Sequence, residues 1–207
     1  MNLAENNKVL IIGEVLAPFQ FSSRVFDEDF YQTYVSVSRL SGEKDIIPVL
    51  VSNRMFDVTQ DLTGKTVFAN GQYRSYIRKE GERNHLILTM CPYAFMLLDD
   101  KEVVNKGGNN QIMLDGYICR KPVFRKTPKG REITDLFVAV NHPYGKSDYI
   151  PCICWGENAR YAEKQSIGTN VIIHGRIQSR EYSKRINETE VDVRVAYEVS
   201  VSKIKCK

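Results

Sequence analysis

The sequence repeats itself with an offset of 103 residues, and this internal repeat constrains the fold more than any other feature. The aligned segments are Leu10–Val15 with Met113–Ile118, Tyr34–Arg39 with Phe137–His142, and Asp45–Val51 with Asp148–Cys154. With one more residue of offset, Gly64 and Gly71 align with Gly168 and Gly175. So long a period indicates two duplicated domains rather than a solenoid of short repeats.

The repeat also sets the domain boundaries. Segment 99–109 is polar and contains a Gly-Gly pair, which is typical of a linker. We therefore expect a first domain at residues 1–98, a linker at 99–109 and a second domain at 110–207. The chain has 207 residues and is 43% hydrophobic, enough for two cores of ordinary size and too apolar for a disordered chain.

Each copy is predicted to consist mostly of strands. In the second copy, β-branched or alternating runs occupy residues 111–119, 133–141, 148–155, 169–182 and 189–204. The helix-forming segment 156–168 lies between the third and fourth runs. This order is typical of an OB-fold. We predict an all-β protein of two tandem five-stranded OB-fold Greek-key barrels, each with a helix between strands 3 and 4. In the first copy the helix candidate is 54–62, and 78–84 is the expected turn between strands 4 and 5.

One repeated strand carries aromatic residues in the second copy only. Alternation in "DYIPCICW" (Asp148–Trp155) places Ile150, Cys152 and Cys154 inside the barrel. The outward residues are Tyr149, Pro151, Ile153 and Trp155. The first copy has Ile46 and Ser52 at the two aromatic positions. An outward face with rings at both ends suits base stacking; the alternative is that the rings pack under the helix or a neighbouring subunit.

Charge is distributed unequally between the two copies. Residues 1–106 contain 12 Lys and Arg against 14 Asp and Glu, whereas residues 107–207 contain 17 against 11. This asymmetry favours a polyanionic partner for the second half, although an ordinary solvated basic surface fits the same count.

The sequence favours neither a metal site nor an enzyme. Five cysteines at irregular spacing, without a C-x-x-C pair, indicate free thiols in a reducing compartment. Cys152 and Cys154 lack a structural-zinc spacing and are expected to pack in the core, so we predict no metal and no cofactor. No catalytic motif occurs, and we expect Asp45 and Asp148 to cap turns. The N-terminus lacks the features of a signal peptide and no apolar run could cross a bilayer, so we expect no membrane partner.

The second half resembles the OB domain of bacterial single-stranded DNA-binding proteins. Two stretches carry the resemblance, Pro122–Lys164 and Ser166–Tyr182. The first stretch contains Thr-Pro-x-Gly, a strand ending in Ala-Val-Asn, an acidic–aromatic pair, a strand ending in Trp, and a helix. The second contains an Ile-Gly turn and Gly-Arg-Ile-x-x-Arg-x-Tyr. The first half resembles the family mainly through the second.

The resemblance implies DNA-binding residues. Tyr149, Trp155 and Tyr182 match the family's stacking aromatics, and stacking is indifferent to base identity. Cations gathered beside these rings are expected to contact phosphates: Arg120, Lys121, Arg125, Lys126, Lys129, Arg131, Arg176, Arg180, Lys184 and Arg185. The first copy, with Ile46, Ser52 and Arg78 at the aromatic positions, keeps Tyr73, Arg74 and Tyr76 as a weaker secondary site.

The resemblance also implies a function. It is sequence-independent binding and protection of single-stranded DNA in replication, recombination or repair, by a cytoplasmic, nucleoid-associated homodimer with four OB folds. Relatives usually continue into a flexible segment with an acidic recruiting tip; this sequence has no such tail, so we expect no recruiting role. Two alternatives remain, an assembly module related to primosome proteins and an RNA-binding OB protein. Strong salt dependence would separate DNA binding from the first, and a preference for RNA would support the second.

Overall fold

The computed structural model describes residues 5–81, 83–99, 108–185 and 191–207, most of which lie in strands. The first half contains β1 (Asn7–Val15), β2 (Gln20–Val25), β3 (Glu28–Ser38), β4 (Lys44–Ser52), β5 (Thr66–Glu80) and β6 (Arg83–Leu97). The second contains β7 (Asn110–Ile118), β8 (Val123–Lys126), β9 (Glu132–His142), η1 (Pro143–Gly145), β10 (Lys146–Trp155), α1 (Glu157–Glu163), β11 (Asn170–Arg185) and β12 (Val191–Cys206). Most of the expected linker, residues 100–107, lies outside the described residues.

Strand pairing closes a ring in each half. In the first half β1 pairs with β3 and β5, β3 with β4, β5 with β6, and β4 with β6 in parallel. In the second half β7, β9, β10, β12 and β11 pair in the same order, again with one parallel contact, between β10 and β12. Short strands β2 and β8 extend the rings as hairpin partners of β3 and β9, which the sequence did not indicate. The mostly β architecture is therefore as predicted.

Glycines that align in the repeat lie where strands approach closely. A Cβ atom on Gly116 would lie 2.5 Å from the carbonyl oxygen of Ala139, and one on Gly13 would clash likewise with Ser36. The aligned pair Gly71 and Gly175 marks a register shift in each of β5 and β11. These strands bend there, because glycine allows the neighbouring backbone to come close.

The helix expected at residues 54–62 is wrong. Residues 53–65 form turns and irregular backbone, whereas α1 follows β10 in the second half as expected. In the first half Asp57 and Asp61 accept hydrogen bonds from the backbone N–H groups of Thr59 (3.1 Å) and Thr63 (2.9 Å). Such side-chain bonds offer the backbone an alternative to helical pairing. The expected turn at 78–84 is confirmed, since β5 ends at Glu80 and β6 begins at Arg83.

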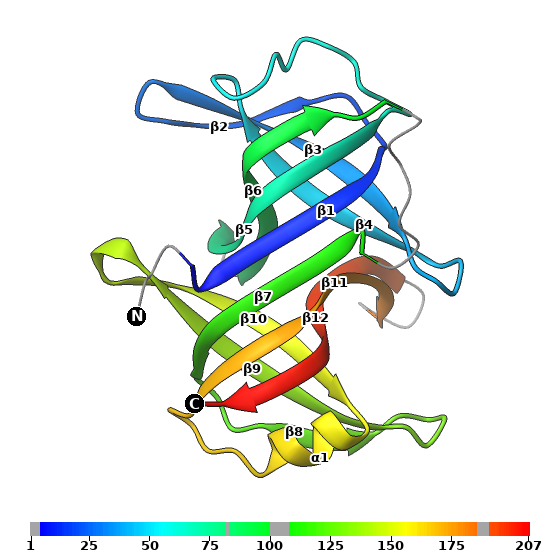
Figure 1. The fold of residues 1–207 in the computed structure, drawn as a ribbon, viewed down its shortest axis with the longest axis vertical. Coiled ribbons are helices and arrows are strands. Elements are labelled where there is room, and N and C mark those ends of the chain that lie inside the picture. The colour runs from blue at the N-terminus through cyan, green and yellow to red at the C-terminus, as the bar shows by residue number, and fades with distance from the viewer. Residues whose placement is uncertain (1–4, 82, 100–107, 186–190) are drawn as a thin grey trace.

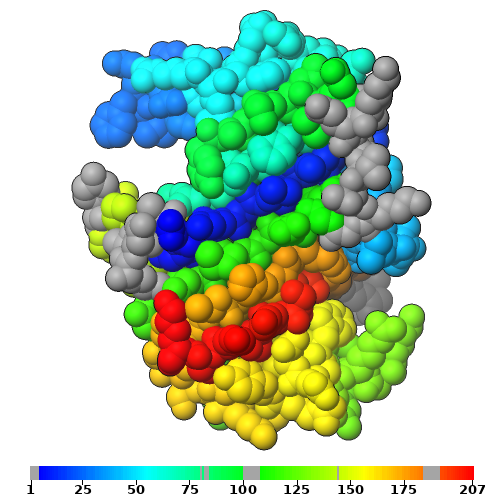
Figure 2. Space-filling model, viewed as in Figure 1, coloured from blue at the N-terminus to red at the C-terminus, as the bar shows by residue number. Residues whose placement is uncertain are grey.

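The two halves are joined by one continuous sheet. β1 pairs antiparallel with β7, with Asn7 opposite Leu114 and Ile11 opposite Asn110. Figure 1 shows these strands side by side at the middle of the molecule, with one half on either side. In Figure 2, β1, β7, β11 and β12 form a continuous band across one face. Most buried apolar side chains of both halves belong to one cluster, so the halves form a single packed body.

Candidate nucleic-acid interface

An exposed stack of three side chains lies on the outer face of β9 and β10. Tyr149 is 45% exposed and its ring stacks on Phe137, with 6.3 Å between centroids and 16° between planes. The guanidinium carbon of Arg120 lies 4.2 Å from the Phe137 centroid on this face. A π-surface beside a cation suits a base and its phosphate. Sequence reasoning missed Phe137, although its alignment with Tyr34 was a signal.

Trp155 lies at the far end of β10 from Tyr149. Its ring is half-buried, and its Nε1–H donates a hydrogen bond to Ser200 Oγ at 3.3 Å. Between the two rings the outward face is not open as expected, because Ile153 is only 5% exposed. β12 pairs in parallel with β10 there, with Ser200 opposite Ile153. The aromatic residues of β10 therefore form two patches rather than one continuous platform.

Tyr182 lies on β11, and its ring is exposed. The guanidinium carbon of Arg180 is 6.0 Å from the ring centroid. Arg180 also lies 3.8 Å from Glu198, whose pKa is raised above its usual range chiefly by burial. This part of the surface thus combines a ring, a cation and one desolvated carboxylate.

Most of the predicted loop cations are exposed. Arg120, Lys121, Lys126, Lys129 and Arg131 lie around the β8–β9 hairpin. Arg125 is also exposed, but its guanidinium forms a two-point pair with Asp135 at 2.6 and 3.2 Å. For Lys184 and Arg185 the structure describes only the backbone, at the end of β11. The hairpin therefore presents cations beside the Trp155 end of β10, where Ile133 pairs with Trp155, whereas Arg120 lies at the Tyr149 stack.

Two predicted DNA-binding arginines, Arg176 of the phosphate group and Arg74 of the secondary site, join the halves. Arg176 donates to the buried Asp45 at 2.6 Å, and Arg74 donates to the buried Asp148 at 2.8 Å. Each carboxylate also accepts from a backbone N–H of the opposite half, that of Ser179 for Asp45 and that of Ser75 for Asp148. Both guanidinium groups are thus held by buried carboxylates of the opposite half, and a contact of either with DNA stays a prediction.

Tyr73 is wrong as a member of the secondary site. Its side chain is fully buried, and burial raises its pKa well above the usual range. Side chains of β5 alternate between faces, so Tyr73 points inward with Val67 and Ala69, while Tyr76 is exposed. Among the described residues its hydroxyl has no hydrogen-bond partner.

The two thiols of β10 lie in the core. Cys152 and Cys154 are buried as expected, and burial raises the pKa of the Cys154 thiol to about 12. No three His, Cys, Asp or Glu residues of the described segments gather as a metal site. No helix in the described ranges is long and apolar enough to cross a membrane.

Comparison with known families concerns mainly the second half. The model of the single-strand binding protein family matches residues 109–206. Single-stranded DNA-binding protein B of Bacillus subtilis is 33% identical over 96 residues, which cover 42% of this chain and 80% of that protein. The single-stranded DNA-binding protein of Halalkalibacterium halodurans is 34% identical over 96 residues, covering 40% of this chain and 55% of the relative. The chain thus spans about half the length of several curated relatives that it matches.

One solved structure resembles the whole chain. The wild-type single-stranded DNA binding protein from Thermus aquaticus superposes with a TM-score of 0.73 over 97% of this chain and 92% of that chain. The identity is 19%, so the likeness concerns the fold alone. Both halves are included in it.

Proposed function

The chain belongs to the single-strand binding protein family, and from that premise we propose that it binds and protects single-stranded DNA without sequence preference. The observation that carries this proposal is the exposed stack of Arg120, Phe137 and Tyr149. Every base has a π-face, and alanine substitution puts each stacked base at roughly 1–3 kcal/mol, a range established on single-strand binding proteins themselves.

Binding is stoichiometric and involves no covalent step. Bases stack on Tyr149, Trp155 and Tyr182, while the cations of the β8–β9 hairpin follow the phosphates. A strand held in this way cannot pair with its complement, and its backbone is shielded. Because the protein offers rings and cations rather than hydrogen bonds to base edges, it does not select a sequence.

We extend the proposal to the architecture and the cellular role. Each half is an OB-fold, with boundaries at residues 1–98 and 110–207, and the same order of strand pairing in both halves supports this. The protein acts in the cytoplasm beside the nucleoid, in replication, recombination or repair.

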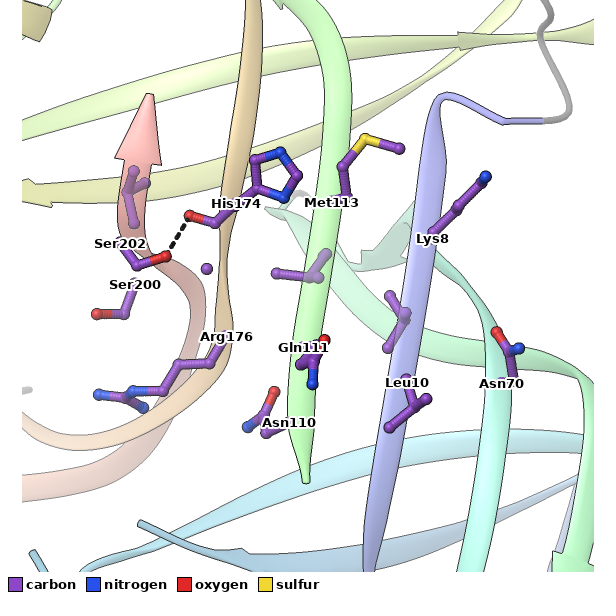
Figure 3. A pocket seen from close by; sticks show the side chains of 14 residues that line it. Lys8, Leu10, Asn70, Asn110, Gln111, Met113, His174, Arg176, Ser200 and Ser202 are labelled. Atoms are coloured by element: carbon purple, nitrogen blue, oxygen red, sulfur yellow. Dashed lines mark hydrogen bonds between the residues drawn. The ribbon is translucent and has the colours of Figure 1, made fainter. Parts of the chain in front are cut away.

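The protein forms a homodimer that brings four OB folds together. Support comes from the outer face of the sheet that β1 and β7 share, where Leu10 lies opposite Gln111 and Lys8 lies opposite Met113. Figure 3 shows these side chains around a shallow cavity of about 610 Å³ that spans β1, β7 and β11. Met96, which is exposed on β6, extends the apolar part of this face. Such a face suits contact with its own copy.

The proposal is tested by binding a labelled oligo-dT at several salt concentrations, with duplex DNA and oligo-U as competitors. We expect tight binding that weakens with salt, by about 0.7 in log K per log salt for each phosphate neutralised. Equal binding of duplex would contradict the proposal. Preference for oligo-U would favour an RNA-binding protein, and absence of binding to all three would favour an assembly module.

A further inference from the structure

By its sequence, the first half lacks the stacking rings of the second half. It nevertheless keeps one aromatic residue, Tyr34, on the equivalent face. Tyr34 aligns with Phe137 in the repeat. On β3 it lies opposite Pro48, just as Phe137 on β9 lies opposite Pro151. Tyr34 is 37% exposed. The ring that supports Tyr149 in the second half therefore has an exposed counterpart in the first.

The equivalent strands β5 and β11 both carry an aromatic residue and an arginine, in opposite order. With an offset of 104, Tyr76 aligns with Arg180 and Arg78 aligns with Tyr182. Both tyrosines are exposed, Tyr76 by 42% and Tyr182 by 39%. The tyrosine and the arginine have thus exchanged positions between the two strands, and each half keeps one of each.

These rings meet in one groove between the halves. Tyr34 and Tyr76 of the first half, with Tyr182 and Tyr197 of the second, line a groove of about 480 Å³. This volume falls within the range of about 300–1,000 Å³ for small-ligand sites. Neither half contains the groove alone, because the β11–β12 hairpin supplies one side of it.

The charge of the groove suits a nucleotide. Arg78 and Arg194 line it, and Asp192, the one carboxylate among the described residues of its lining, is held by Arg194 at 2.5 Å. Burial raises the pKa of Tyr76, and it raises that of Tyr197 to about 12. A tyrosine hydroxyl is neutral at neutral pH even at its ordinary pKa, so these groups do not repel a phosphate.

β5 connects the second-half stack to the groove. Tyr149 donates its backbone N–H to Ser75 Oγ at 2.7 Å, and the next residue along β5 is Tyr76. Residues 75 and 76 of β5 therefore connect the backbone beside Tyr149 with the lining of the groove.

We propose that this groove, formed by Tyr34, Tyr76, Tyr182 and Tyr197, binds a nucleobase of single-stranded DNA as the strand passes from the second half to the first. The inference rests on the proposed function in single-stranded DNA binding. In this proposal the first half contacts DNA through a groove that both halves line, although β4 lacks the two aromatic rings of β10.

Photo-crosslinking tests the position of the strand. An oligodeoxythymidylate with 5-iodouracil at several positions is irradiated on the full-length protein, and the linked peptides are identified by mass spectrometry. We expect links to Tyr34 or Tyr76 of the first half in addition to links in the second half. Tight binding with links confined to Tyr149, Phe137, Trp155 and Tyr182 overturns the groove but leaves the proposed function standing. No binding at all overturns both.

Substitution tests the contribution of the rings. The double variant Tyr34→Ala with Tyr76→Ala removes two exposed side chains, and we expect it to bind oligo-dT at least about 10-fold more weakly. The ring-preserving double variant Tyr34→Phe with Tyr76→Phe should keep wild-type affinity. Tyr161→Ala, which removes an exposed tyrosine from α1 outside the groove, is the matched control. A double alanine variant with wild-type thermal unfolding and wild-type affinity overturns the proposal.

Discussion

Asp45 and Asp148 occupy equivalent positions in the two halves, and each carboxylate is bound by an arginine of the other half. Arg176 reaches Asp45 at 2.6 Å and Arg74 reaches Asp148 at 2.8 Å. The two carboxylates are 1% and 3% exposed. The duplication has thus produced a reciprocal pair of bridges that, with the β1–β7 pairing, fixes one half against the other.

Breaking one bridge should destabilise the protein. Asp45→Asn leaves Arg39 and Arg176 without their carboxylate, and both arginines are about one-quarter to one-third exposed. Loss of one partner of a buried pair costs about 3–5 kcal/mol, so we expect about 2–3 kcal/mol after allowing for solvent screening. Urea unfolding gives the value. Asp135→Asn, which breaks the exposed pair with Arg125, should cost less than about 1 kcal/mol. Equal losses would contradict the bridging role of Asp45.

Stability should fall at mildly acidic pH through His142. Burial, with the nearby Arg74 charge, holds the pKa of His142 below its ordinary value of 6.5. As the pH falls below 6.5, His142 is protonated in the unfolded chain before it is protonated in the folded protein. The free energy of unfolding therefore decreases as the pH falls, until His142 is protonated in the folded protein as well. The free energy of unfolding, measured between neutral pH and pH 5, should decline less in His142→Gln than in the wild type. If the free energy of unfolding declines with pH equally in the wild type and in His142→Gln, protonation of His142 does not contribute to the loss of stability.

Removing the carboxylate of Glu198 should strengthen DNA binding. Glu198 lies 3.8 Å from Arg180, and burial raises its pKa. Glu198→Gln frees Arg180 for a phosphate and removes a negative charge from the surface beside Tyr182. We expect affinity for oligo-dT to rise, by roughly 10-fold at most, at low salt. Glu163→Gln on α1 makes the same change in net charge away from this surface. If Glu198→Gln and Glu163→Gln raise the affinity for oligo-dT equally, the gain comes from net charge and not from the release of Arg180.

A charge on the shared sheet face should prevent dimerisation. Leu10→Glu places a carboxylate on the outer face of β1, where two copies would have to desolvate it. Light scattering should give twice the chain mass of 23.8 kDa for the wild type and the single mass for the variant. Ile167→Glu, at an exposed apolar residue after α1, should remain dimeric. A monomeric wild type would refute the homodimer outright.

The strands could be predicted from sequence because their signals are local. Alternation places β10 and β11 within a few residues of their observed bounds, and the aligned glycines mark bends that occur in both halves. The same alternation predicts that Tyr73 points inward, because Tyr73 lies on the same face of β5 as the buried Val67 and Ala69. The failed helix at 54–62 reflects competition from Asp57 and Asp61, whose side chains bind the backbone instead.

The contacts between the halves could not be predicted. Arg74 and Asp148 are 74 residues apart and Arg176 and Asp45 are 131 apart, so no periodicity connects them. For that reason the sequence pointed to Arg176 as a phosphate ligand, to Arg74 as part of a secondary site, and to both aspartates as turn caps. The tyrosine groove was hidden likewise, since its sides come from different halves.

Trp155, the one tryptophan of the chain, reports directly on whether bases stack on the aromatic residues of the second half. Poly-dT is titrated into the protein at low and high salt while the tryptophan fluorescence is followed, with duplex DNA as the control. We expect strong quenching that weakens with salt and is absent with duplex. Unchanged fluorescence, together with no retention of poly-dT on a filter, would show that these rings serve packing and that the duplicated fold is a scaffold.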